Sequence, residues 1–96
     1  MALAQFAFMN LDGAPPAAYA AGATVETETI SGANAATTAA SQGGQNACRV
    51  AVDTASYVSF GAAPNAGTDT VRFFLPAGSI EYFRIGVGLK AAVIAA

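Results

Sequence analysis

Histidine and tryptophan are absent from this 96-residue chain, and cysteine occurs once, at Cys48. Without histidine, Ser/His/Asp and Cys/His catalytic arrangements are impossible, and histidine-ligated zinc or iron sites are excluded as well. A single cysteine cannot form an intrachain disulfide, so no disulfide framework stabilises the fold. We therefore expect a protein that is not an enzyme and that binds no cofactor.

Charged side chains are scarce too: they make up 10% of the residues and give a formal net charge of −2. The four basic residues all follow position 48, and they are too few to form the basic footprint that nucleic-acid binding requires. No apolar run approaches the ~18 residues of a membrane-spanning helix. We expect neither nucleic acid nor a membrane as a partner.

Large apolar side chains are fewer than the hydrophobic fraction of 54% suggests, because 25 of the residues are alanine and only 27 are larger apolar residues. A chain of this length buries only about 60–65% of the surface that its unfolded form exposes. The core is therefore small, and we expect contacts with other chains to supply part of the stability.

Two strands are predicted in the first half of the chain. Residues 3–9 alternate, and the alternation is expected to direct Phe6 and Phe8 inward. Residues 23–30 alternate glutamate with β-branched residues, a pattern that predicts a strand whose Glu26 and Glu28 face water.

Residues 31–47 contain no large apolar side chain, and a structureless loop of this length is unusual in a compact domain. Two interpretations remain open. The segment is either a flexible loop or an extended arm that becomes ordered only against a neighbouring subunit.

The second half alternates apolar and polar residues in short runs separated by Gly/Pro turns, at 47–53, 55–60, 70–76, 79–85 and 89–96. The fold class predicted is all-β: a small β-sandwich or barrel of about six to seven short antiparallel strands with a long Ala/Thr/Gly-rich loop or arm. We expect one domain over 1–96, in which 1–46 supply N-terminal strands plus the loop or arm and 47–96 form a compact strand-rich core.

Few side chains are candidates for chemistry. Cys48 alternates with Val50 and Val52, which favours a small core residue over a reactive thiol. Glu26 and Glu28 are spaced like a carboxylate pair or part of a calcium site, but a solvated strand face explains them better. The aromatic residues Phe73, Phe74, Tyr82 and Phe83 are interpreted as core in preference to a stacking platform.

Charge is divided unevenly along the chain. The first half carries Asp12, Glu26 and Glu28 and no basic residue, whereas the second half has a net charge of +1 from four basic and three acidic residues. This asymmetry suggests the hypothesis that the first half docks on an electropositive neighbour or on the arginines of a second copy.

Three elements of the second half occur in a specific order: CRVAVDTASYVSFGAAP over 48–64, LPAGSIEYF over 75–83 and KAAVI over 90–94. In their order and spacing they resemble small virion-associated accessory proteins of tailed bacteriophages. The resemblance covers about half of the chain. It implies a capsid decoration (cement) protein that binds the major capsid protein on the surface of the virion, after synthesis in the cytoplasm of a bacterial host. It also implies a homo-oligomer, with trimers at threefold positions.

Other roles within this resemblance are a head fibre and a tail or connector accessory protein, and a receptor- or glycan-binding β-sandwich module remains a separate alternative. The candidate contact residues are chosen by charge and by their place beside turns; they are Asp12, Glu26, Glu28, Arg49, Arg72, Arg84, Glu81 and Tyr82. The competing interpretation is that these side chains only meet solvent or pair within the domain.

Overall fold

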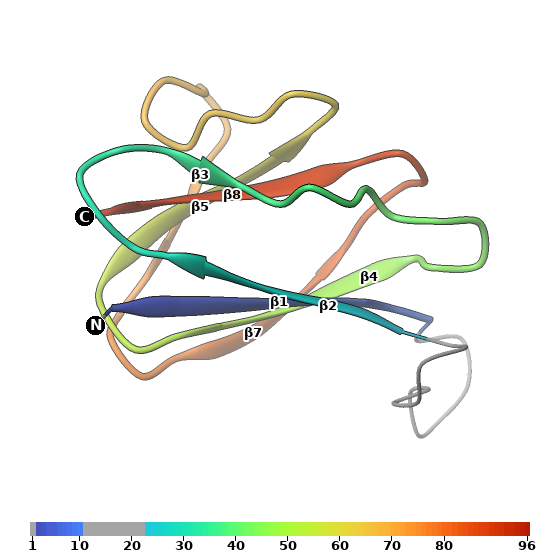
Figure 1. Ribbon diagram of the computed structural model, residues 1–96, viewed down its shortest axis with the longest axis horizontal. Helices are drawn as coiled ribbons and strands as arrows, with labels where there is room; N and C mark the ends of the chain where they lie inside the picture. The colour runs from blue at the N-terminus through green and yellow to red at the C-terminus, as the bar shows by residue number, and fades with distance from the viewer. Residues whose placement is uncertain (1, 11–22) are drawn as a thin grey trace.

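The computed structural model describes residues 2–10 and 23–96, and its secondary structure there consists of eight β-strands (Figure 1). The strands are β1 (Leu3–Met9), β2 (Thr24–Thr29), β3 (Ala35–Ala36), β4 (Ala47–Val52), β5 (Ser56–Gly61), β6 (Phe73–Leu75), β7 (Ile80–Arg84) and β8 (Lys90–Ala95). None of these residues forms a helix, so the described part of the chain has no helix that could cross a membrane.

The strands form two antiparallel four-stranded sheets that lie as two layers (Figure 1). The order is β2-β1-β4-β7 in the first, called sheet A, and β3-β8-β5-β6 in the second, called sheet B. The prediction of an all-β fold is confirmed, and the two layers correspond to the sandwich of the two architectures that the sequence allowed. There is one strand more than the six to seven expected, since β3 lies in the segment predicted to be a loop.

The core lies between the sheets and is built mainly from the predicted alternation. Phe6 and Phe8 of β1 are fully buried, as expected, and β1 lies in the middle of sheet A. Val50 of β4, Val58 of β5 and Val93 of β8 are also fully buried in the same cluster. Each such side chain contributes about 1.5–3 kcal/mol by burial.

Strand β2 has the opposite orientation to the one predicted. Its β-branched residue Val25 is exposed, whereas Glu26 and Glu28 are half-buried on the side of the buried Ile30. The register places Glu26 beside Phe6, so both share the inner face of sheet A. The burial of Ile30 sets this orientation, because residues two positions apart in a strand share one face.

The Ala/Thr/Gly-rich segment between β2 and β4 lies along β8 in the same chain. Besides the β3 pairing, the backbone N–H of Thr37 donates to Ala91 O at 2.8 Å, and that of Ser41 donates to Leu89 O at 2.9 Å. The hydroxyls of Thr37 and Ser41 accept hydrogen bonds from the N–H groups of Ala91 and Leu89, both at 3.1 Å. Short polar side chains that hydrogen-bond to β8 therefore hold the segment where apolar anchors are missing.

The loop between β5 and β6 covers the outer face of sheet B (Figure 1). Asn34 holds it by donating to Pro64 O at 3.3 Å and accepting from the N–H of Ala66 at 2.8 Å. Ala66 is fully buried, and a Cβ on Gly67 would lie 3.1 Å from Cδ1 of Ile94 on β8. Sheet B is thus packed on both faces over this area.

Candidate interaction surfaces

Metal-ligating clusters and an activated thiol are both missing from the described residues. Residues 2–10 and 23–96 contain no group of three Cys, Asp or Glu side chains that could hold a metal ion. Cys48 is buried in the core cluster, and desolvation raises the pKa of its thiol to about 12, against a lowering by the backbone hydrogen bond at Ala7. The thiol is therefore protonated at neutral pH, the state in which it is a poor nucleophile.

The acidic contact candidates Glu26 and Glu28 lie on the inner side of sheet A. The Glu26 carboxylate accepts hydrogen bonds from the backbone N–H groups of Thr38, at 3.0 Å, and Ala39, at 2.6 Å. Glu28 lies two residues further along the same inner side, where burial and the neighbouring Glu26 raise its pKa. Glu26 thus joins two segments of its own chain, while Asp12 lies outside the described residues.

Arg72 also contacts its own chain. Its guanidinium carbon lies 4.1 Å from the ring centroid of Tyr57, and its Nη1 donates to Ala66 O at 3.0 Å. The Tyr57 ring meets the Phe74 ring edge-on, with 5.7 Å between centroids. Arg72 thereby fastens the β5–β6 loop to the outer face of sheet B.

Three of the candidates do come together, on the outer face of sheet A. Arg49 of β4 and Tyr82 of β7 are directly paired in the register, and Arg84 follows Tyr82 by two residues on the same face. Nη1 of Arg49 lies 3.4 Å from its hydrogen-bond acceptor, Oε1 of Gln5 on β1. This half of the outer face therefore combines two cations with an exposed phenol ring.

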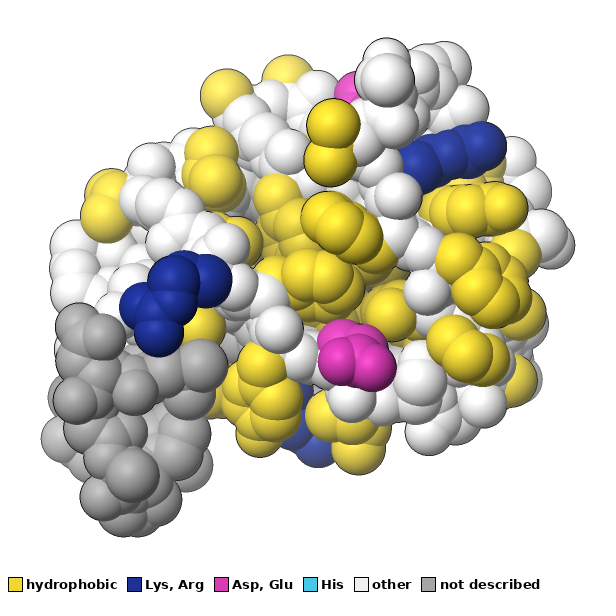
Figure 2. All heavy atoms as spheres, turned by 180° about the vertical axis from the view of Figure 1, so that it is seen from behind, with side chains coloured by type: hydrophobic (Ala, Val, Ile, Leu, Met, Phe, Trp, Pro, Cys, Tyr) yellow, Lys and Arg dark blue, Asp and Glu magenta, His cyan; other side chains and the backbone are white. Residues whose placement is uncertain are grey.

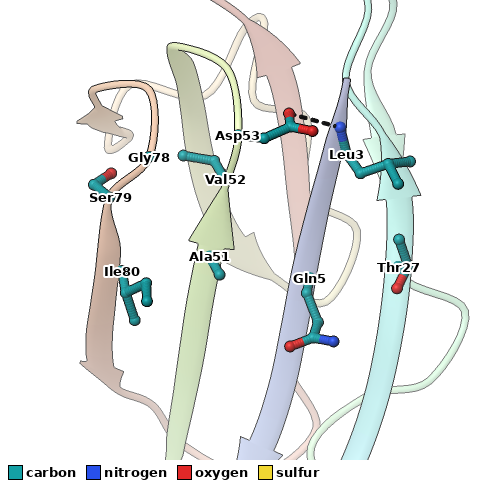
Figure 3. A pocket seen from close by; sticks show the side chains of 9 residues that line it. All are labelled: Leu3, Gln5, Thr27, Ala51, Val52, Asp53, Gly78, Ser79 and Ile80. Atoms are coloured by element: carbon teal, nitrogen blue, oxygen red, sulfur yellow. Dashed lines mark hydrogen bonds between the residues drawn. The ribbon is translucent and has the colours of Figure 1, made fainter. Parts of the chain in front are cut away.

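The other half of the same face contains a shallow hollow of about 440 Å³ (Figure 3). Its floor is the row Thr27, Gln5, Ala51 and Ile80, one residue from each strand of sheet A. At its rim Asp53 accepts a 2.8 Å hydrogen bond from the N–H of Leu3, which satisfies one carboxylate oxygen within the chain. The exposed Leu3, Val25 and Ile80 make this outer face partly apolar, and nothing in their sequence pattern marks them as part of one surface.

Aromatic rings occupy the gap between β6 and β7 at the far edge of the sandwich. Phe83 of β7 contacts Phe60 of β5 and Phe73 of β6, with centroids 5.1 and 5.0 Å apart. Figure 2 looks onto this edge, where hydrophobic side chains gather across the middle. The prediction that the aromatic residues of β6 and β7 are core is wrong for Phe73, Phe74 and Tyr82, which are exposed. Tyr82 lies on the outer face of sheet A, Phe74 on that of sheet B beside Tyr57, and Phe73 at the open gap beside β7.

Glu81 is exposed on the edge strand β7, and the register places it beside the buried Val50, on the inner side of sheet A. Of the seven candidates in the described residues, Arg49, Tyr82 and Arg84 lie together on the outer face of sheet A. Glu26, Glu28 and Glu81 lie on its inner side, and Arg72 lies against sheet B. No protein-family model, curated protein or solved structure matches the chain.

Proposed function

We propose that the protein is a structural component of a bacteriophage particle, a capsid decoration (cement) protein that binds the major capsid protein lattice and stabilises the head. The class of protein in this proposal is the one implied by the resemblance of residues 48–94 to virion accessory proteins. It includes localisation on the capsid surface and self-association into a homo-oligomer, for which the resemblance implies trimers.

One observation carries the proposal: the chain covers one outer face of the sandwich with its own loop and leaves the other outer face exposed. The outer face of sheet B is covered by the chain's own β5–β6 loop, which Asn34 and Arg72 hold in place. The outer face of sheet A instead exposes Leu3, Val25 and Ile80 around a shallow hollow. A flat, partly apolar sheet face suits attachment to a large partner surface.

The charges on this face indicate the chemistry of the partner. Arg49 lies on it, and Asp53, the one acidic side chain of this face among the described residues, already accepts the N–H of Leu3. We therefore expect the lattice to present apolar side chains bordered by carboxylates. A modest contact per copy suffices, because a lattice repeats it many times.

The test compares two matched valine variants for binding to purified particles that lack this protein. Val25 is 55% exposed on the outer face of sheet A, and Val71 is 70% exposed in the connection between β5 and β6. Val25→Asp is expected to lose particle binding and the associated gain in particle heat resistance, while Val71→Asp retains both. Equal binding by the two variants would contradict docking through sheet A, and absence of the wild-type protein from particles would remove the proposal.

A position elsewhere on the particle, as a head fibre or as a tail or connector component, belongs to the same class. It is distinguished by where labelled protein lies on particles in electron micrographs. A reconstruction of the intact particle would also settle which face of the sandwich meets the lattice.

A glycan- or receptor-binding module is a second candidate, which the exposed rings of Phe74 and Tyr82 favour. These rings are 53% and 52% exposed, and aromatic faces commonly stack on sugars. A glycan-array signal that Tyr82→Ala or Phe74→Ala abolishes would support this module and count against decoration. An array without signal leaves the decoration protein as the better proposal.

A further inference from the structure

The four edge strands of the sandwich differ in how well they resist the addition of another strand. β3 and β6 are only two and three residues long. β2 directs two carboxylates, Glu26 and Glu28, toward the space between the sheets, and inward-pointing charges are one way in which proteins protect an edge. β7 is five residues long and carries one such carboxylate, Glu81. It is therefore the edge that is least protected.

Backbone groups of β7 point outward from this edge. The N–H of Val52 donates to Ser79 O at 3.1 Å, and the N–H of Ile85 donates to Asn46 O at 3.0 Å, so the odd-numbered residues face β4. Because hydrogen-bonding direction alternates along an antiparallel strand, the N–H and C=O groups of Ile80 and Tyr82 point away from the sheet.

Exposed apolar side chains lie on this edge and beside it. Of the large hydrophobic residues that are exposed in the described part of the chain, Ile80 and Tyr82 lie on β7, and Phe73 of β6 contacts Phe83 of β7. A strand added to β7 would cover Ile80 and Tyr82 and approach the half-buried Phe83 in the gap beside β6. Burial of these side chains would add a hydrophobic term to the new backbone hydrogen bonds.

We propose that β7 pairs antiparallel with β7 of a second copy across a two-fold axis, so that the two A sheets join into one eight-stranded sheet. In this arrangement Tyr82 faces Tyr82 of the second copy, and Ile80 faces Arg84 of the second copy. All five residues of β7 are then paired, and a two-fold contact gives each copy the same environment.

The charges of β7 favour this register over the registers that are shifted along the strand. A shift that places Glu81 on the axis brings two carboxylates directly opposite each other, and a shift that places Arg84 on the axis does the same for two guanidinium groups. Like charges directly opposite in a sheet are destabilising. An axis at Tyr82 or Phe83 avoids both conflicts, and Tyr82 is the choice that uses the full strand.

This inference depends only on the edges of the sandwich and is independent of the proposed role on a particle. It gives the contact a definite symmetry, since two-fold pairing through one edge produces a dimer where the resemblance implies trimers. The experiment therefore uses the purified protein alone, and its outcome does not depend on capsid binding.

The first test removes an outward N–H without touching the β4 ladder. Proline is tolerated on an edge strand where the missing N–H would face solvent, so Tyr82→Pro should fold but lose the edge contact. Thr27→Pro is the matched control, because the N–H of Ile30 donates to Ala2 O and the alternation then directs the N–H of Thr27 away from β1. Analytical ultracentrifugation is expected to give a dimer for the wild type and Thr27→Pro and a monomer for Tyr82→Pro, with folding checked by circular dichroism.

A second test reports the register and does not depend on the proline variant folding. Cysteine at the axis position should crosslink to its own counterpart, so Tyr82→Cys is expected to give a disulfide-linked dimer under mild oxidation. Val25→Cys, equally exposed on β2, should remain uncrosslinked, as should the wild type with its buried Cys48. A monomeric or trimeric wild type, or crosslinking of Val25→Cys at the rate of Tyr82→Cys, would overturn the proposal.

Discussion

Glu26 and Ala39 are joined by a 2.6 Å hydrogen bond in which the β2 carboxylate accepts the backbone N–H just after β3. The neighbouring N–H of Thr38 binds the same carboxylate, so one side chain connects an edge strand of sheet A with the segment that edges sheet B. This connection closes the gap between the layers on the side of β2 and β3, where few large apolar side chains are available.

The first prediction compares the two glutamates of β2. Glu26→Ala is expected to lower the free energy of unfolding by about 1–3 kcal/mol, because two amides lose a charged acceptor. Glu28→Ala removes no hydrogen bond described in this structure and should change stability by less than about 0.5 kcal/mol. Urea denaturation of both variants measures the difference, and equal losses would show that Glu26 does not hold the gap closed.

Glu28 also gives a pH-dependent expectation. Burial and Glu26 raise its pKa above the ordinary 4.5, so its charged form opposes folding at neutral pH. Glu28→Gln should therefore be slightly more stable than the wild type at pH 7, and this advantage should disappear as the pH falls below 4.5. Melting temperatures of both proteins across this range provide the measurement. An advantage that persists in acid would have another cause.

The buried thiol leads to a prediction at alkaline pH. Burial raises the pKa of Cys48 from 9.0 to about 12, so above pH 9 the unfolded chain loses the thiol proton while the folded chain keeps it. The unfolded state then binds fewer protons, and stability falls as the pH rises between about 9 and 12. The fall should be steeper in the wild type than in Cys48→Ala, which retains every tyrosine as an internal control. Denaturation at pH 8 and pH 10.5 tests this, and identical slopes would count against it.

Two substitutions of Arg72 distinguish the effect of its charge from that of its planar guanidinium group. Arg72→Lys keeps the positive charge but loses the planar group above Tyr57, whereas Arg72→Ala loses both. We expect Arg72→Ala to lower stability by about 1–2 kcal/mol, from the cation–π contact and the hydrogen bond to Ala66 O together. The stability of Arg72→Lys should lie between those of the wild type and Arg72→Ala. Each loss of stability should be accompanied by faster proteolysis within 62–72. Unchanged protease resistance in Arg72→Ala would mean that other contacts hold the loop.

Ser59 provides a variant that should not harm the fold. It is fully buried on β5, and its hydroxyl is the one buried side-chain polar atom without a hydrogen-bond partner among the described residues. Ser59→Ala removes that group without adding volume and should raise stability by up to about 1 kcal/mol. Ser56→Ala is the matched control, since that hydroxyl donates to Thr54 O at 2.6 Å and its loss should be destabilising. Thermal melts of the two variants should shift in opposite directions.

The sequence predicted the strands best where large apolar residues alternate. β1, β4, β5 and β8 are of this kind, and the inward direction of Phe6 and Phe8 followed from the alternation alone. The same rule failed for β2, since alternation identifies two faces without saying which is buried. Ile30 was the signal that assigns the face, because the largest apolar residue of that run shares a side with Glu26 and Glu28.

The position of the 31–46 segment could not be predicted from the sequence. Its hydrogen bonds go to Ala91 of β8 and to Leu89 just before that strand, about fifty residues away, and hydroxyls such as that of Thr37 make them. A hydroxyl in a polar run carries no periodic signal, so the pattern resembles a loop. The candidate surface could be predicted only in part for a similar reason. The charges of Arg49 and Arg84 are evident in the sequence, but the open face of sheet A depends on tertiary structure, because the β5–β6 loop covers sheet B and leaves sheet A uncovered.

The β5–β6 loop and the open face of sheet A lie on opposite sides of the sandwich. A copy docked through the outer face of sheet A holds 62–71 on the side turned away from the partner, whatever the partner's identity. A peptide inserted within that loop would therefore be displayed outward on every bound copy, all in the same orientation. The fold can in this way serve as an oriented display scaffold.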